Sequence, residues 1–208
     1  MRWGLRANNP TDGIDEIHEE ARHRWLSDVE LKRLTAVLDE HPDQVAADAI
    51  RLQLLTGARI GEVLGSTWTD FDLDRGVWTK MSHHTKQKRT EHLPLSSAAT
   101  ELLKAIKEDR GAISDFVFPG RSPKAPRKDL KGFWRSVLAT ADISDYRIHD
   151  NRHTHASHLV SSGMSLAIVG RLLGHTNPST TQRYAHLADD PLREASEIMG
   201  RKFTDQRM

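Results

Sequence analysis

The spacing of apolar residues constrains the fold of this chain more than any other sequence feature. From Leu26 to about Gly65, apolar residues recur at intervals of three and four, as in amphipathic helices. Residues 67–81 alternate β-forming and polar residues around an Asp-Arg-Gly turn, which indicates a β-hairpin, and residues 89–96 indicate a third strand ended by Pro94. Helical spacing then returns. The sequence therefore predicts an α+β fold that is mainly helical, with a small antiparallel β-sheet.

Start and stop signals set the helix boundaries. Ser27 and Glu30 form a predicted capping box, and Leu26 and Leu31 can form a hydrophobic staple across it. Gly57 is expected to end a second helix, and Asn177-Pro178 to begin a late one. Other helices are expected over residues 43–56, 59–65, 98–109, 129–141, 149–161, 165–173 and 191–199, and a short strand over 115–118.

Composition limits the cellular setting. The chain has 208 residues, enough for one domain with a real core or for one domain with an appendage. It has no cysteine, which excludes disulfides and fits a reducing, cytoplasmic location. No apolar run approaches the ~18 residues of a membrane span, and the N-terminus lacks the apolar core of an export signal.

The distribution of charge is more informative than the net charge of +1. Residues 80–89 carry four Lys or Arg and no acid, and residues 121–135 carry six Lys or Arg and one Asp. These segments would meet a polyanion if they share a face, although two solvated loops would have the same composition. The candidate DNA-binding residues are Lys88, Arg89, Arg127, Lys128 and Lys131.

Several short motifs carry residues suited to phosphate chemistry. His149 and Arg152 are three apart, so on a helix they project from one face. Arg59 follows a predicted helix end, and Glu62 three residues later can hold its guanidinium. Arginine suits bidentate phosphate binding, and histidine exchanges protons near neutral pH. Each motif alone is also typical of an ordinary surface helix or loop, as are a lysine in the hairpin loop, Lys86, and a histidine after a helix-ending glycine, His175.

The chain has two tyrosines, and each is a possible nucleophile. Tyr184 lies in the polar stretch "GHTNPSTTQRYAHL", where a packing role would be unusual for its large ring. It is either a half-exposed surface residue or an activated nucleophile. Tyr146 lies three residues before His149, near a helix start, and we interpret it as structural.

Together these motifs resemble the tyrosine recombinases, the phage integrase family. "TGARIGEVL" is similar to the first arginine motif, "TK" followed by "LPLS" to the β-hairpin lysine motif, "HDNRHTHASHL" to the His-x-x-Arg motif and "LLGHTNPSTTQRYAHL" to the last motif. The resemblance covers about residues 10–190, and four motifs in family order and spacing are highly specific. Asn151 and His155 depart from the apolar or aromatic residues usual at their positions.

The resemblance implies a role for each motif residue. Tyr184 would attack a DNA phosphodiester to give a 3′-phosphotyrosyl link and a free 5′-hydroxyl. Arg59 and Arg152 would bind the non-bridging oxygens, and Glu62 would orient Arg59. His175 would add a hydrogen bond, His149 would act as the base, and Lys86 would protonate the leaving 5′-oxygen. The link conserves the bond energy, so no cofactor, ATP or metal is expected.

The resemblance also implies an organisation for the chain. Residues 1–25 resemble the linker that follows an N-terminal DNA-clamp domain, residues 26–190 the catalytic domain, and residues 191–208 a tail helix. The expected partner is double-stranded DNA. The tail is expected to support a tetramer on DNA only, because one helix stripe buries too little to hold subunits without it.

Three other classes of protein remain to be weighed. A zinc protein could use His149, His153, His155 and His158, which have ligand-like helical spacings, but the chain has no cysteine and no His-Glu-x-x-His motif. A DNA-binding module without catalysis would need no nucleophile. A type IB topoisomerase uses similar chemistry and would differ in lacking strand exchange between two sites.

Overall fold

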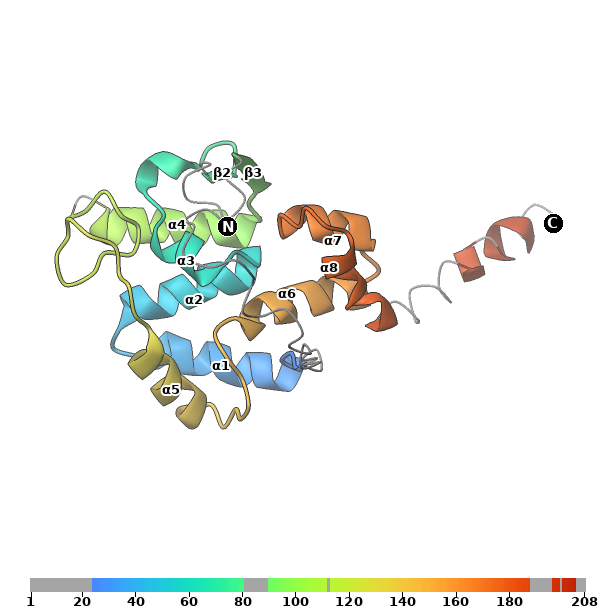
Figure 1. Cartoon of the computed structure of the whole chain (residues 1–208), viewed down its shortest axis with the longest axis horizontal. Coiled ribbons are helices and arrows are strands. Elements are labelled where there is room, and N and C mark those ends of the chain that lie inside the picture. Colours follow the sequence, from blue (N-terminus) through green and yellow to red (C-terminus); the bar gives the residue numbers. More distant parts are fainter. Residues whose placement is uncertain (1–23, 81–89, 112, 188–195, 199, 205–208) are drawn as a thin grey trace, which may run out of the picture.

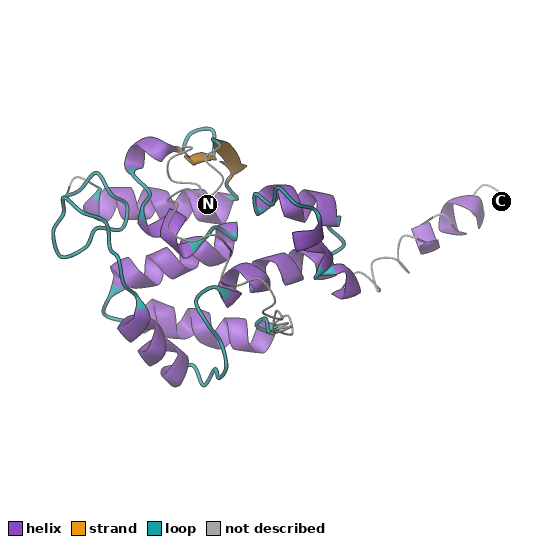
Figure 2. Cartoon of the chain, viewed as in Figure 1, coloured by secondary structure: helices purple, strands orange, loops and turns teal. Residues whose placement is uncertain are grey.

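The computed structural model describes residues 24–80, 90–111, 113–187, 196–198 and 200–204. Within them, helices surround a central helix, and a small sheet lies at one edge (Figures 1 and 2). Helix α2 (Gln44–Thr56) is this central helix and contacts α1 (Asp28–Glu40), α3 (Ile60–Leu64), α4 (Ser97–Arg110) and α6 (Asp150–Ser161). The predicted mainly helical α+β fold is therefore confirmed.

The local signals for the first helices act as the sequence predicts. The Ser27 side chain accepts a hydrogen bond from the Glu30 N–H, and the Glu30 carboxylate accepts one from the Ser27 N–H, which completes the capping box of α1. Helix α2 ends at Gly57, whose φ of 63° lies in the left-handed region that favours glycine. Eight of its thirteen residues are buried, as a helix surrounded by others requires.

The sheet is antiparallel in the order β1-β2-β3. Strand β2 (Val77–Lys80) pairs with β1 (Phe71–Asp72) and with β3 (Glu91–Pro94), with Trp78 opposite both Phe71 and Leu93. The short helix η1 (Trp68–Asp70) shortens the first strand. The strand expected over residues 115–118 is wrong: Phe116 forms only an isolated bridge with Thr67, since no neighbouring strand extends the pairing.

The basic segment leads into helix α5 (Lys131–Thr140), close to the predicted range. The Arg127 guanidinium donates two hydrogen bonds to the Asp43 carboxylate, with N–O distances of 2.9 and 2.5 Å. Asp43 also accepts from the Ala46 N–H and so caps α2. One ion pair thus ties this segment to the start of the central helix.

The last part of the domain has its own small core. Helix α6 contacts α7 (Leu166–Leu172), and α7 contacts the four-residue helix α8 (Ser179–Gln182), which precedes η2 (Ala185–Leu187). Five buried residues form this second cluster: Ala156, Val160, Val169, Leu173 and Tyr184. The main core, around α1 to α5, holds many more. The domain therefore has one large core and one small satellite.

Residues 196–198 and 200–204 are helical, and in Figure 1 they lie apart from the other helices. Across the described ranges, every helix is too short or too polar to cross a bilayer.

Candidate active site

A polar pocket of about 260 Å³ collects the motif residues from three parts of the chain. Arg59 comes from the start of α3, two histidines and an arginine from α6, and the rest from the segment between α7 and η2. Its lining consists of Arg59, His149, Arg152, His153, His175, Thr176, Asn177, Thr180, Arg183 and Tyr184. Five of the six residues expected to be catalytic thus meet in one place. The sixth, Lys86, lies outside the described residues.

Arg59 is held by a chain of ion pairs that runs through Glu62 and Lys80 to Glu91. Its Nη1 donates to Glu62 Oε1 at 2.8 Å, and Glu62 Oε2 also accepts from the Arg59 backbone N–H. Glu62 is buried and accepts from Lys80 Nζ at 3.1 Å, and Lys80 pairs with Glu91 at 3.2 Å. Burial alone would raise the pKa of Glu62, but Lys80 and Arg59 outweigh it and lower that pKa. Glu62 therefore stays charged and fixes Arg59.

Lys80 is a residue that our sequence reasoning missed. It is only 3% exposed, which is rare for lysine unless the charge is paired. From the sequence, it belongs only to the basic run 80–89, which is expected either to meet a polyanion or to be a solvated loop. The one signal that could have found it is the alternation of β2, which places Trp78 and Lys80 on the same, inward face.

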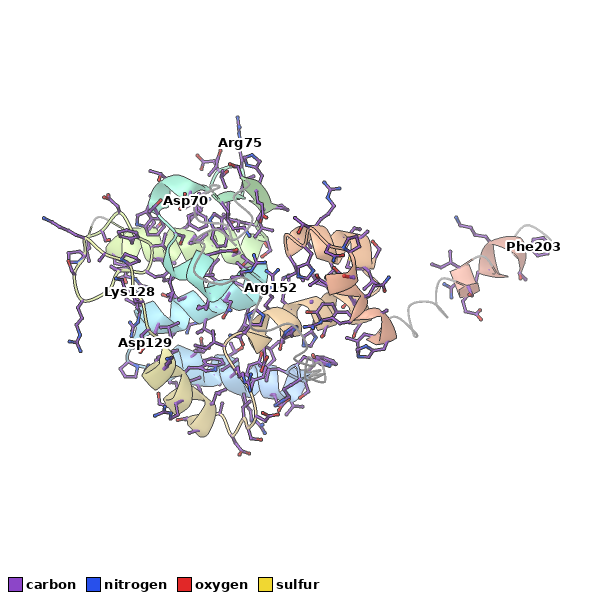
Figure 3. The ribbon with its side chains drawn as sticks, in the orientation of Figure 1. Asp70, Arg75, Lys128, Asp129, Arg152 and Phe203 are labelled. Carbon is purple, nitrogen blue, oxygen red and sulfur yellow. The ribbon has the colours of Figure 1, made fainter. Side chains whose placement is uncertain are left out.

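Arg152 is buried between the two parts of the domain, where Figure 3 labels it. Its Nη1 donates to the Gly57 carbonyl at 2.7 Å and its Nη2 to the Leu173 carbonyl at 2.5 Å. Burial and nearby Arg59 lower its pKa to about 10, so it remains a cation at neutral pH. A guanidinium has five N–H donors, and these two bonds fix its plane without using all of them.

Glycine permits this close approach of α2, α6 and α7. A Cβ at Gly57 would lie 2.6 Å from His155 and 2.7 Å from Leu173. Gly174, with φ of 66°, ends α7 and lies against the carboxylate of Glu91. Since His175 follows directly, the same turn that needs glycine aims His175 toward the pocket.

His149 and His175 line the pocket together with Arg152. Burial first, then the charge of Arg152, lowers the pKa of both imidazoles, to about 4 for His175. His175 Nδ1 lies 2.9 Å from Thr181 Oγ1, which fixes the ring. Both histidines are therefore neutral near pH 7 and can donate or accept a hydrogen bond.

Tyr184 is buried, so the half-exposed surface interpretation is wrong. Its ring belongs to the satellite cluster, and its hydroxyl lies 2.6 Å from His153 Nδ1. Burial raises the pKa of the phenol, while Arg183 and Arg152 oppose that rise. His153 is the second residue that sequence reasoning missed as part of the site. Its signal was its position four residues after His149, on the same helix face.

The two departures from the family pattern connect α6 to α2. Asn151 donates to Gln53 Oε1 at 2.9 Å and accepts from the Tyr146 hydroxyl at 2.9 Å. His155 Nδ1 lies 2.8 Å from the Leu54 carbonyl. Tyr146 also bonds Thr154 Oγ1 at 2.7 Å, and burial raises the pKa of its phenol. Tyr146 thus belongs to a buried polar network and does not line the pocket.

The other predicted positions are placed as follows. Lys88 and Arg89 lie outside the described residues. Lys128 and Lys131 are exposed, whereas Arg127 is bound to Asp43. Of the four histidines weighed as zinc ligands, His149 and His153 line the pocket, and His158 Nε2 lies 2.9 Å from the Leu26 carbonyl. Over the ranges that can be described, no group of three or more His, Cys, Asp or Glu could hold a metal ion.

Three arginines, three histidines and one tyrosine thus line one pocket of this mainly helical domain. The profile of the Phage integrase family matches residues 24–190. The chain belongs to this family, as its motifs indicate.

Curated relatives agree with the family match. The integrase of Salmonella phage P22 is 30% identical over 186 residues, covering 83% of this chain and 46% of that protein. The tyrosine recombinase XerD of Vibrio cholerae (strain El Tor Inaba N16961) is 30% identical over 182 residues, covering 81% and 59%. The chain thus spans about half the length of these relatives.

Solved structures share the fold. The catalytic domain of the bacteriophage HP1 integrase is 25% identical with a TM-score of 0.63, covering 83% of this chain and 93% of that one. The Tn1549 transposon integrase in complex with a circular intermediate DNA is 19% identical with a TM-score of 0.73, covering 92% and 70%. The expected fold of a tyrosine-recombinase catalytic domain is therefore confirmed.

Proposed function

We propose that this chain catalyses site-specific DNA recombination, by cleaving and rejoining strands through a 3′-phosphotyrosyl link to Tyr184. The observation that carries the proposal is the convergence of the Tyr184 hydroxyl with Arg59, Arg152 and His175 on one pocket. Attack on a phosphodiester requires a nucleophile, together with cations and hydrogen-bond donors that stabilise the charge developing on the phosphate oxygens.

The two arginines form the binding site for the phosphate. Arg59 is aimed by Glu62, and Arg152 is aimed by two backbone carbonyls, so both guanidinium planes are fixed before DNA arrives. Each retains donors for the non-bridging oxygens, which carry more charge as the fifth bond to phosphorus forms. His175, held by Thr181, adds a hydrogen bond to the same oxygens.

The leaving group needs a proton as the nucleophile forms its bond. We assign that proton to Lys86, on the β2–β3 connection that begins next to the ion-paired Lys80. The phosphotyrosyl bond stores the energy of the broken phosphodiester. Rejoining is then the reverse attack by a 5′-hydroxyl and needs neither ATP nor a metal.

Covalent capture tests the proposal. A pool of nicked duplexes with randomised sequence around the nick is offered, so that the short strand released by cleavage diffuses away and leaves DNA attached to protein. Tyr184→Phe is expected to abolish the adduct and keep DNA binding, because only the hydroxyl is lost. Tyr146→Phe is the matched control and should still form it. Adducts from Tyr184→Phe but not from Tyr146→Phe would contradict the assignment.

Strand exchange separates this proposal from a topoisomerase. The DNA sequence recovered from the adducts is placed on two labelled duplexes. A recombinase joins a strand of one duplex to the other, whereas a topoisomerase only relaxes supercoils in one. Joined products are expected. Relaxation without any joined product would favour the type IB topoisomerase instead.

The basic segments are proposed to bind the DNA backbone. Lys88, Arg89, Lys128 and Lys131 would each neutralise a phosphate, and the exposed Lys128 and Lys131 have side chains available for it. Arg127 makes its contribution through Asp43, by fixing the segment. Fluorescence anisotropy gives the association constant for DNA at several salt concentrations, and its logarithm falls linearly with the logarithm of the salt concentration. Each lysine changed to alanine should make this slope less steep by about 0.9.

Assembly on DNA is proposed to use the tail. An apolar groove of about 470 Å³ lies between α1, α2, α4 and α6, lined in part by Leu31, Leu54, Leu102 and Leu159. Tail residues Ile198 and Phe203 are 45% and 61% exposed, and in a second copy they could fill this groove. The result would be a ring of four protomers on two DNA sites.

Two variants test this assembly. Phe203→Ser should weaken DNA-bound oligomers on native gels and leave the DNA-free chain monomeric, while Lys202→Ser on the same tail serves as the control. Leu102→Ser on the groove should match Phe203→Ser. A stable tetramer without DNA in light scattering would contradict the proposal.

A further inference from the structure

The contact that the motif roles leave unexplained is the one between Tyr184 and His153. His153 Nδ1 lies 2.6 Å from the Tyr184 hydroxyl, and the ring centroids are 6.0 Å apart. His149, the expected base, lies one turn earlier, with its ring 5.3 Å from that of His153 and edge-on to it. Between these two described histidines, only His153 is hydrogen-bonded to the phenol.

We propose that His153 is the catalytic base of this site: it takes the phenolic proton of Tyr184 during cleavage and returns it during rejoining. The inference rests on the proposed function. As Tyr184 Oη bonds to phosphorus, its proton moves to His153 Nδ1, and the phosphorus–O5′ bond breaks with a proton from the general acid. In the reverse step, His153 protonates Tyr184 as the phosphotyrosyl bond breaks.

The ionisation of the two groups is compatible with this role. Burial, then His149 and Arg183, lowers the pKa of His153 to about 4, while burial raises that of Tyr184. Near pH 7 the phenol therefore carries the proton and Nδ1 can accept its hydrogen bond. A phosphodiester in the pocket adds negative charge beside His153. This charge offsets the nearby cations and strengthens His153 as a base when the substrate is bound.

The fold holds His153 and Tyr184 in place for the transfer of the phenolic proton. His153 follows Arg152 directly on α6. The Arg152 guanidinium donates from both Nη atoms to the carbonyls of Gly57 and Leu173, which holds this turn of the helix beside the pocket. Tyr184 reaches His153 from a different element, beyond α8. The ionisable groups that face His153 come from α6, from the segment around α8 and from the chain before α1. They are His149, Asp150 and Arg152, then His175, Arg183, Tyr184 and His186, and finally Arg24.

The test compares His153→Gln with His149→Gln in single-turnover cleavage of the captured DNA sequence. Glutamine keeps a hydrogen-bonding group but cannot take up a proton. His153→Gln should slow adduct formation by about 10²-fold, the lower end for loss of a general base, with DNA affinity unchanged. His149→Gln should slow it less. A wild-type chain that forms no adduct would overturn the proposed function itself, and a His153→Gln chain that cleaves as fast as wild type would overturn only this inference.

Two changed reactants distinguish a base from a group that only positions the tyrosine. With 3,5-difluorotyrosine at position 184, whose phenol is more acidic, the deficit of His153→Gln should shrink at least several-fold. A substrate with sulfur as the 5′ leaving atom needs no general acid and should leave the deficit intact. An equal deficit with both tyrosines, or rescue by the sulfur substrate, would overturn the assignment.

A measurement on chains with both histidines covers the case in which His153→Gln does not fold. In ¹⁵N-histidine spectra, Tyr184→Phe should change the pH titration of His153 and leave that of His155 unchanged. No change at His153 would mean that the hydrogen bond does not form in solution and would overturn the inference.

Discussion

The two sides of the active site are built in different ways. The arginine side, with Arg59 and Glu62, rests on the main core and on a chain of buried ion pairs through Lys80 to Glu91. The tyrosine side rests on a four-residue helix and a satellite cluster of five buried residues. The groups proposed to bind phosphate are thus held by many contacts, whereas Tyr184, the proposed nucleophile, is held by few. Segments with few buried contacts open most easily, so motion in this site is expected on the tyrosine side.

Removing Glu62 should produce the largest effect, because it leaves Arg59 without its carboxylate and the buried Lys80 with Glu91 alone. Glu62→Ala should lower the free energy of unfolding by about 3–5 kcal/mol, the usual cost of breaking a buried ion pair, and should slow cleavage. Urea unfolding and adduct formation measure the two effects.

The double variant Glu62→Ala/Lys80→Met separates stability from chemistry. The second change removes the buried charge of Lys80, so the double variant should recover part of the stability. It should recover none of the cleavage rate, because Arg59 still lacks the carboxylate that orients it. Full stability in Glu62→Ala alone would show that the ion-pair chain does not support the arginine side.

Gly57→Ala should have the second largest effect, because it pushes the two sides apart. Its φ of 63° disfavours a side chain, and the new Cβ would meet His155 and Leu173. We expect a loss of about 1–3 kcal/mol in stability and a slower reaction, since the Gly57 carbonyl anchors Arg152. Gly61→Ala is the matched control, because nothing lies within 4 Å of its added Cβ. Equal thermal melts for the two variants would contradict this account.

Acid should weaken the tyrosine side before the arginine side. The pKa values of His153 and His175 fall from 6.5 in the unfolded chain to about 4 in the fold. Their contribution to stability is therefore complete above pH 6.5 and is lost as the pH falls toward 4. Burial likewise lowers the pKa of His149 and His155, so their contribution is also lost as the pH falls below 6.5. Glu62, with a pKa below 4.5, begins to lose its contribution only at lower pH.

Urea unfolding between pH 7.5 and 4.5 measures this order. The free energy of unfolding should fall through the window, and His153→Gln and His175→Gln should each flatten the decline. A decline of the same slope in both variants would place its origin in other groups.

Thr181→Val should give the smallest effect. It keeps the shape of a buried residue and removes the hydroxyl that fixes His175. We expect a loss of about 0.5–1.5 kcal/mol in stability, as for one hydrogen bond, and a few-fold slower cleavage. Ser179→Ala, an exposed position on the same helix, is the control. A cleavage rate unchanged in Thr181→Val would show that His175 needs no such support.

Local features of the site could be predicted from the sequence. The Arg59–Glu62 pair and the shared face of His149 and Arg152 follow from helical spacing, and Gly57 follows from its helix-ending position. The capping box at Ser27 is equally local. In each case the interacting groups lie within four residues, so the helix itself brings them together.

The tertiary structure decided the contacts that join distant segments. His153 and Tyr184 are 31 residues apart, Lys80 and Glu62 are 18 apart, and Arg127 and Asp43 are 84 apart. Periodicity shows which face of a helix is apolar, but not which helix packs against it or which polar group faces another across the gap. The sequence by itself therefore determined the family, the motif residues and the helix ends. Only packing decided which histidine holds the tyrosine and which lysine is buried, because those depend on how α6 and β2 dock on the rest of the fold.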